Sequence, residues 1–221
     1  MYNLVLDQNG NLIMNLANRL TMLRVFLVPV FIVFMSIDSF YTNIIALFVF
    51  IMASITDYFD GVIARKQNIV TTFGIFLDPL ADKLLVTSAF ICFVSLYTLN
   101  IPAWMVICII AREFIITGLR SIAASKNIII PASMSGKVKT TSQMIAIITI
   151  LVILSINSTI IKFYSVTPYD LADSSQKVQK VFGAILINAP YWLMLITTIL
   201  TIYSGINYML KHKNVFSDQN K

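Results

Sequence analysis

Charged residues are scarce in this sequence. Aspartate, glutamate, lysine and arginine make up only 12% of the 221 residues, whereas 58% are hydrophobic. An ordinary soluble domain carries about 25% charged residues, so this composition excludes a typical soluble fold. The mean hydropathy of +0.84 points the same way. The composition is that of a polytopic membrane protein.

Histidine and cysteine are nearly absent. His212, the single histidine, stands between Lys211 and Lys213 in a basic tail, so we reject it as a catalyst or a metal ligand. Cys92 and Cys108 lie in apolar runs and have no spacing typical of metal ligands or of an extracellular disulfide framework. We interpret both cysteines as small buried hydrophobic residues.

The positive net charge of +6 does not indicate a nucleic-acid partner. The basic residues are spread between apolar runs, where they more often set the membrane topology. Residues 1–13 lack the basic start and apolar stretch of a signal peptide. We expect the segment 1–17 to be poorly ordered or a short surface helix, and Met14 is an alternative initiator.

The apolar runs predict an all-α fold with six transmembrane helices, since a span needs about 20 apolar residues. The predicted transmembrane domain covers residues 18–213, and 214–221 form a C-terminal tail. The polar stretch 157–180 reads as an extramembrane loop with room for a short amphipathic helix. The six apolar runs are 20–37, 43–56, 73–96, 102–124, 144–156 and 181–209.

Six spans place both termini on one side of the membrane. The basic-rich side is cytoplasmic by the positive-inside rule. We therefore expect an integral, multi-pass protein of a bacterial inner membrane with both termini in the cytoplasm. The basic-rich side carries Arg19, Arg24, Arg65, Lys66, Lys126, Lys137, Lys139, Lys211, Lys213 and Lys221, against Lys162, Lys177 and Lys180 on the other side.

Four aspartates gather between positions 57 and 82, in otherwise apolar sequence. Residues three, four, seven or eight apart share one face of a helix. Asp57 and Asp60 therefore lie on one stripe, and Asp78 and Asp82 lie on a stripe of the next helix. A short link joins the two helices, so the carboxylate stripes can face each other.

These carboxylates predict a metal-binding polar cavity near the cytoplasmic side. An acid at bilayer depth costs roughly 2.5–3.5 kcal/mol, which argues against a purely structural role for four of them. Like charges in one pocket repel and become protonated unless cations neutralise them. Carboxylate oxygens suit Mg²⁺ or Mn²⁺.

The full pattern is Asp-x-x-Asp-Gly-x-x-Ala-Arg, eight residues, then Gly-x-x-x-Asp-x-x-x-Asp. It resembles the signature of the CDP-alcohol phosphotransferase family, with every position filled. The resemblance covers most of the chain and implies an integral membrane enzyme that displaces CMP from a CDP-linked donor with an alcohol. It also implies two divalent cations, Mg²⁺ or Mn²⁺, and a homodimer.

The resemblance assigns roles to the signature residues. It implies that Asp57, Asp60, Asp78 and Asp82 bind the metal ions and that Asp82 also acts as the general base. Gly61, Gly74 and Ala64 leave room for the CDP group, and small residues also permit tight helix packing. The implied donor-binding residues are Asp60, Gly61, Ala64, Arg65 and Gly74.

Two further segments, around Arg24 and around Arg112, resemble the phosphatidylglycerophosphate synthase branch of the family. Arg24 could point inward toward phosphate or extend to lipid headgroups. The lysines of the predicted loop 135–143 could bind phosphate or reflect the positive-inside bias. The candidate acceptor-phosphate residues are Thr21, Arg24, Arg112, Arg120, Lys137 and Lys139.

Three functions compete. The leading one is transfer of a phosphatidyl group from CDP-diacylglycerol to glycerol 3-phosphate, in contact with membrane lipid. The second keeps the fold and changes the acceptor to phosphatidylglycerol, inositol phosphate or serine. The third is a cation channel or transporter that uses the carboxylates as an ion path, and the complete signature argues against it.

Overall fold

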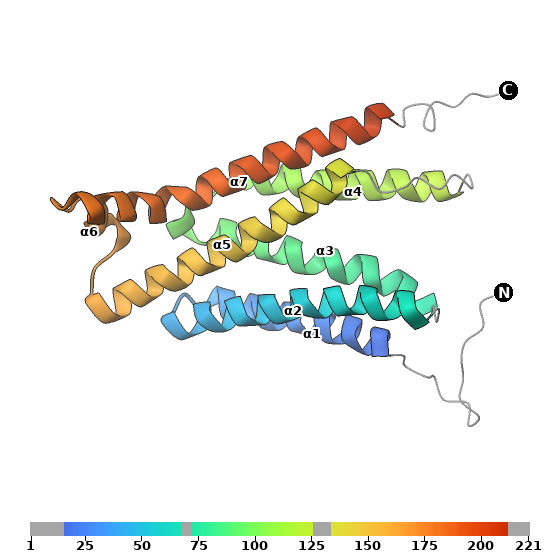
Figure 1. Cartoon of the computed structure of the whole chain (residues 1–221), viewed down its shortest axis with the longest axis horizontal. Helices are drawn as coiled ribbons and strands as arrows, with labels where there is room; N and C mark the ends of the chain where they lie inside the picture. The colour runs from blue at the N-terminus through green and yellow to red at the C-terminus, as the bar shows by residue number, and fades with distance from the viewer. Residues whose placement is uncertain (1–15, 68–71, 126–133, 212–221) are drawn as a thin grey trace. The chain divides into compact units, whose positions relative to one another are not determined.

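The computed structural model describes residues 16–67, 72–125 and 134–211, and the side chains of 22–56, 83–125 and 134–211. All regular structure in these residues is helical, which confirms the predicted all-α class. The predictions for 1–15, for 212–221 and for His212 lie outside the described residues. The helices (Figure 1) are α1 Leu16–Ser36, α2 Phe40–Gln67, α3 Thr72–Ser95, η1 Tyr97–Leu99, α4 Ala103–Ser125, α5 Met134–Tyr164, α6 Pro168–Ala172 and α7 Lys177–Lys211.

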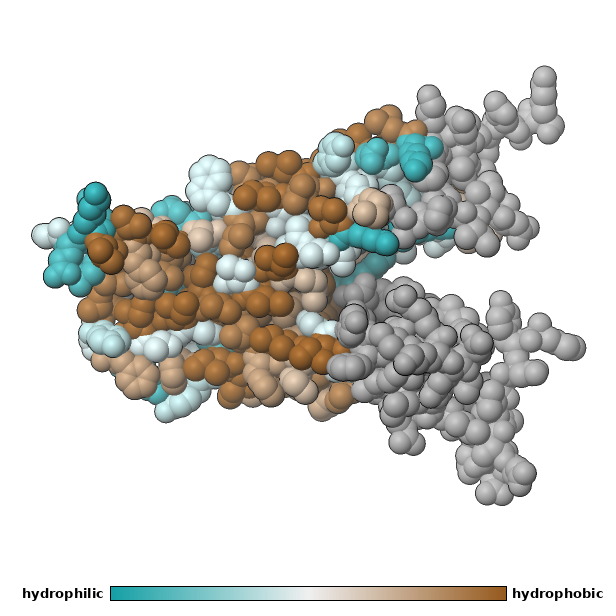
Figure 2. Space-filling view, in the orientation of Figure 1, coloured by the Kyte–Doolittle hydropathy of each residue, from teal (hydrophilic) through white to brown (hydrophobic). Residues whose placement is uncertain are grey.

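Helices α5 and α7 are long and apolar enough to cross a membrane, judged by length and composition over the described residues. The apolar parts described in α1, α2 and α3 are shorter, at 10–17 residues. The helix exteriors are rich in hydrophobic side chains (Figure 2), and Phe26, Phe48 and Phe114 are 67%, 64% and 70% exposed. Such exposed apolar surface indicates a membrane protein.

The chain forms two compact units. The first is Met1–Cys92 with Leu151–Ser165, and the second is Phe93–Ile150 with Val166–Lys221. Each unit therefore takes part of α5.

In the first unit, α1 and α2 lie side by side (Figure 1), joined by a short turn after Ser36. Their buried residues recur every three or four positions, as a helix packing one face requires. The rings of Phe31 and Phe50, both fully buried, have centroids 5.7 Å apart. The Thr42 hydroxyl donates to the carbonyls of Ile37 and Ser39, which closes the turn between the helices.

In the second unit, α7 packs against α4 and against the short helix α6. Gly183 makes the α6 contact possible, because a Cβ there would lie 2.5 Å from the Ala172 nitrogen and 2.7 Å from the Pro168 carbonyl oxygen. Further along, α7 buries a polar stripe at helical spacing. The stripe consists of Thr197, Thr198, Thr201, Ser204 and Tyr208.

A capping box starts α6. The Thr167 hydroxyl accepts from the Asp170 backbone nitrogen at 3.2 Å, and the Asp170 carboxylate accepts from the Thr167 backbone nitrogen at 2.8 Å. Hydrogen bonds from the Thr167 side chain and backbone lower the pKa of the Asp170 carboxyl below its ordinary value. The predicted extramembrane loop does contain a short helix.

The limits of α5 correct two sequence predictions. The helix begins at Met134, so the predicted loop 135–143 is helical, and it ends at Tyr164, inside the predicted loop 157–180. The apolar run gave the wrong limits because polar residues continue a helix where their side chains find partners in the protein. Lys139 and Gln143, four residues apart, are 5% and 3% exposed.

Candidate active site

The signature residues lie on two successive helices, as predicted. The first half of the motif falls in the last turns of α2 and the second half in the first half of α3. The side chains of 57–82 lie outside the described residues, so their convergence stays a prediction. On α2 these residues are Asp57, Asp60, Gly61, Ala64 and Arg65, and on α3 they are Gly74, Asp78 and Asp82.

The described turns next to the motif have a buried face. On α2, Ala53 and Thr56 are 0% and 8% exposed, and on α3, Leu85 and Ala89 are 3% and 0% exposed. The motif begins directly after the first of these segments and ends directly before the second.

Arg24 lies on α1 and is 2% exposed. A side chain that extended along the helix to lipid headgroups would keep its guanidinium accessible, so burial favours the inward orientation of the two that the sequence left open. The side chain of Thr21 lies outside the described residues. Whether Arg24 meets a phosphate stays a prediction.

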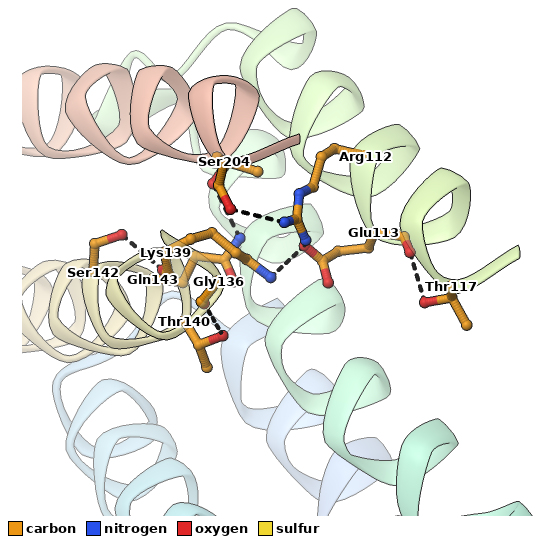
Figure 3. A network of polar contacts seen from close by, with 10 residues as sticks. Arg112, Glu113, Thr117, Gly136, Lys139, Thr140, Ser142, Gln143 and Ser204 are labelled. Carbon is orange, nitrogen blue, oxygen red and sulfur yellow. Dashed lines mark hydrogen bonds and ion pairs between the residues drawn. The ribbon is translucent and has the colours of Figure 1, made fainter. Parts of the chain in front are cut away.

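The second unit contains a charged network in the middle of α4. Arg112 and Glu113 lie near the centre of this helix, and Lys139 reaches Glu113 from α5 (Figure 3). One carboxylate oxygen, Glu113 Oε1, accepts from Arg112 Nη1 at 3.2 Å and from Lys139 Nζ. The side chains are 13%, 18% and 6% exposed for Arg112, Glu113 and Lys139. Two nearly buried cations thus share one carboxylate.

Helix α7 fixes the orientation of Arg112. Its Nη2 donates to Ser204 Oγ at 2.9 Å (Figure 3), and the next residue, Gly205, lets the arginine stem pass close to the α7 backbone. A Cβ at Gly205 would lie 3.0 Å from Arg112 Cγ. The guanidinium is therefore held in place, and its Nε–H is buried without an acceptor among the described residues.

Gln143 and Thr201 extend the polar contact between α5 and α7. Gln143 Nε2 donates to Thr201 Oγ1 at 3.4 Å, and both residues are buried. This contact lies one helical turn from Lys139 on α5, so it helps to fix the face that carries the lysine.

The other predicted acceptor residues of the second unit do not all lie on the same side of their helices. The Arg120 guanidinium carbon lies 5.5 Å from the centre of the buried Tyr208 ring, so Arg112 and Arg120 both face α7. This agrees with the shared helix face that their spacing predicted. Lys137 is two residues from Lys139 on a helix, which puts it near the opposite face, and it is exposed. The structure thus brings Arg112 and Lys139 together and leaves Lys137 apart.

Sequence reasoning missed Glu113 and Ser204 as members of this network. Glu113 is the only glutamate in the chain and stands beside a buried arginine in the middle of an apolar helix. An unpaired charge there is expensive, so the pairing could have been predicted. Ser204 gave no such signal, because a serine in an apolar helix commonly bonds its own backbone.

No group of three or more histidine, cysteine, aspartate or glutamate residues that could hold a metal ion occurs among the side chains that the structure describes. The four signature aspartates are outside that set. Their chemistry fits a hard divalent cation, since all four are carboxylates.

Sequence comparisons agree with the motif. A CDP-diacylglycerol–glycerol-3-phosphate 3-phosphatidyltransferase of Bacillus subtilis (strain 168) is 45% identical over 145 residues, 60% of this chain and 74% of the relative. A protein of the same name from Rickettsia bellii is 44% identical over 148 residues, 66% of this chain and 80% of the relative. A probable phosphatidylglycerophosphate synthase of Mycobacterium tuberculosis (strain H37Rv) is 42% identical over 138 residues, 61% and 65% of the two chains. The family described as CDP-alcohol phosphatidyltransferase matches residues 14–204, and the chain belongs to this family.

Proposed function

We propose that this protein transfers the phosphatidyl group of CDP-diacylglycerol to glycerol 3-phosphate, which yields phosphatidylglycerol phosphate and CMP. The observation that carries the proposal is the set of relatives, 42–45% identical, whose names state this activity or its product. The buried pair of Arg112 and Lys139 adds a chemical reason, because a phosphorylated acceptor needs cations that a serine acceptor does not.

The aspartates of α2 and α3 are the proposed reaction centre. Asp57, Asp60, Asp78 and Asp82 would hold the divalent cations, Mg²⁺ or Mn²⁺, that the family generally uses. Such cations, when bound, neutralise the diphosphate and stabilise the leaving oxygen. Asp60, Gly61, Ala64, Arg65 and Gly74 would bind the CDP group, with the glycines and alanine leaving room for it.

The proposed reaction is a single in-line displacement. Asp82 accepts the proton of an acceptor hydroxyl, and that oxygen forms a bond to the phosphorus that bears diacylglycerol. The bond from this phosphorus to the bridging oxygen of CMP breaks, and CMP departs with the bond's electron pair. Asp82 then releases its proton to solvent, which closes the balance of atoms and charge.

Arg112 and Lys139 are the proposed core of the acceptor site. Both cations are nearly buried, and Arg112 Nε is a buried donor without an acceptor among the described residues. A phosphate dianion supplies acceptor oxygens and a negative charge for such cations. Thr21, Arg24, Arg120 and Lys137 stay proposed acceptor-phosphate residues, of which Lys137 has the weakest support because it is exposed.

The proposed topology has six transmembrane helices, a carboxylate-lined cavity near the cytoplasmic side of a bacterial inner membrane, and both termini in the cytoplasm. After replacement of Cys92 and Cys108, a cysteine at Lys137 should react only with a reagent added from the cytoplasmic side. A cysteine at Ser174 should react only from the opposite side. The reverse pattern would overturn the orientation. The homodimer stays a prediction, which cross-linking in native membranes would test.

The function is tested with purified protein, CDP-diacylglycerol and a panel of acceptors, following both CMP release and the lipid product. We expect phosphatidylglycerol phosphate with glycerol 3-phosphate, and little product with serine, inositol phosphate or phosphatidylglycerol. Excess chelator should abolish turnover, and Mg²⁺ or Mn²⁺ should restore it. CMP release with a different preferred acceptor would indicate an enzyme of the same fold that uses another alcohol. The absence of CMP release would contradict the enzyme proposal.

A further inference from the structure

The first unit has a polar pocket that the proposed reaction does not use. It lies where the turn from α1 meets the start of α2 and the last turns of α5, and its volume is about 360 Å³. The residues that line it include Asp38, Ser39, Phe40, Tyr41, Ser158 and Lys162.

Hydrogen bonds from a buried amide hold two of the lining residues, Asp38 and Ser158, in place. Asn43, which is 2% exposed, donates through Nδ2 to Asp38 Oδ1 at 3.2 Å and to Ser158 Oγ at 2.5 Å. One buried amide thus joins α2, the preceding turn and α5. The Asp38 carboxylate and the Ser158 hydroxyl are thereby fixed in position.

Lys162 is held against aromatic rings rather than against a carboxylate. Its ammonium nitrogen lies 3.7 Å from the centre of the Tyr41 ring and 4.3 Å from the centre of the Phe40 ring. A cation–π contact positions an ammonium without consuming all three of its N–H donors. Neither Lys162 nor Asp38 forms an ion pair with any residue whose side chain is described, although both line the same pocket.

One cation and one anion that face a pocket without pairing match a ligand with the opposite two charges. We propose that this pocket binds the phosphoethanolamine headgroup of a membrane phospholipid, with its phosphate on Lys162 and its primary ammonium on Asp38. The hydroxyls of Ser39 and Ser158 are further donors for the phosphate oxygens. A headgroup with net negative charge fits less well, because Asp38 repels it.

The surroundings favour a lipid over a soluble phosphoamine. Tyr41, Phe163 and Tyr164 are 64%, 65% and 74% exposed around the pocket and at the end of α5. Exposed aromatic residues at the end of an apolar helix are typical of the membrane–water interface. Lys162 stands in the last turn of this helix, where a lipid headgroup would lie.

The test is native mass spectrometry of the full-length protein in detergent, titrated with three lipids of identical acyl chains. The headgroups are phosphoethanolamine, phosphocholine and phosphoglycerol, and free phosphoethanolamine is a fourth arm. Each is repeated with Lys162→Met, Asp38→Asn and the control Lys180→Met, an exposed lysine of α7. We expect the phosphoethanolamine lipid to bind about tenfold more tightly than the other two lipids, since a charge-assisted contact distinguishes it.

Lys162→Met and Asp38→Asn should each remove this preference, and Lys180→Met should retain it. Equal affinity for the three lipids, or stronger binding of phosphoglycerol lipid, would overturn the proposal. Free phosphoethanolamine binding as tightly as the lipid would overturn the membrane source. If Lys162→Met does not yield a folded protein, Asp38→Asn decides, and an unchanged preference in that variant contradicts the proposal.

Discussion

The two charged regions of this protein handle charge in opposite ways. The stretch 57–82 carries four aspartates against two basic residues, Arg65 and Lys66, so acid is in excess there. In the network of α4, α5 and α7, the single carboxylate of Glu113 pairs with two cations, Arg112 and Lys139. An excess of carboxylates favours metal ions, whereas buried cations favour a phosphate.

The comparison explains why the sequence predicted the two regions unequally. The aspartate motif has fixed gaps within helical periods, so its helices and register follow directly from the sequence. The network joins residues that are far apart in the chain, such as Arg112 and Ser204. Its members can be identified only from the packed structure, because their separations in the sequence follow no pattern.

We expect the largest effect, a loss of turnover, when one carboxylate of the stretch 57–82 is removed. Asp57→Asn, Asp60→Asn and Asp78→Asn should each abolish activity, because a metal ligand is lost. Asp82→Asn should lower turnover about 10²–10⁴-fold while CDP-diacylglycerol still binds, as expected for a general base. CMP release measures the turnover, and equilibrium binding of CDP-diacylglycerol measures the donor affinity.

The matched control for these variants is Asp173→Asn, an exposed acid after α6. It should leave turnover unchanged. Full activity of any signature variant would remove that aspartate from the proposed centre.

A second variant breaks the network of α4, α5 and α7. Glu113→Gln leaves two nearly buried cations without their shared anion, which should destabilise the protein by about 3–5 kcal/mol. Thermal unfolding in detergent would show a lowered Tm. Adding Lys139→Met should recover part of the loss, because it removes one of the two cations that share the Glu113 carboxylate. A double variant as unstable as the sum of the single ones would mean that the two residues are not coupled.

We expect substitution by alanine to have opposite effects on stability at two glycines of the second unit. Gly183→Ala should destabilise the protein by about 1–3 kcal/mol, because the new Cβ meets the α6 backbone. Gly118→Ala, in α4, has no heavy atom within 4 Å and should be neutral or stabilise by about 0.5–1 kcal/mol. Equal Tm shifts for the two variants would contradict the packing of α6 on α7.

The smallest expected effect concerns the cap of α6 and its pH dependence. The lowered pKa of Asp170 means that its cap contributes fully above the ordinary carboxyl value of 3.8 and is lost as the pH falls through the lowered pKa. The protection factors of the amides of residues 168–172, which divide out the intrinsic pH dependence of exchange, should therefore fall only in acid. Asp170→Asn should lower these protection factors at neutral pH and remove their further loss in acid, whereas Asp173→Asn should preserve that loss.

The sequence predicted the helical class, the helical state of the signature and the shared face of Arg112 and Arg120. It failed where polar residues continue a helix, as at 134–143, because hydropathy shows where a span is apolar and not where its helix ends. It also grouped Lys137 with Lys139 in a loop, whereas the helix puts them near opposite faces. The role of Glu113 was missed, although its place beside Arg112 in an apolar helix made the pairing predictable.

The most direct test of the account is the pair of Michaelis constants of Arg112→Ala. If the donor binds at α2 and α3 and the acceptor phosphate binds Arg112, the KM for glycerol 3-phosphate should rise about tenfold or more. The KM for CDP-diacylglycerol should change by less than about twofold, with kcat nearly unchanged if the lost interaction is uniform binding. A variant with weakened donor binding alone, or with unaltered kinetics, would show that Arg112 only partners Glu113 and Ser204, and would contradict the acceptor site.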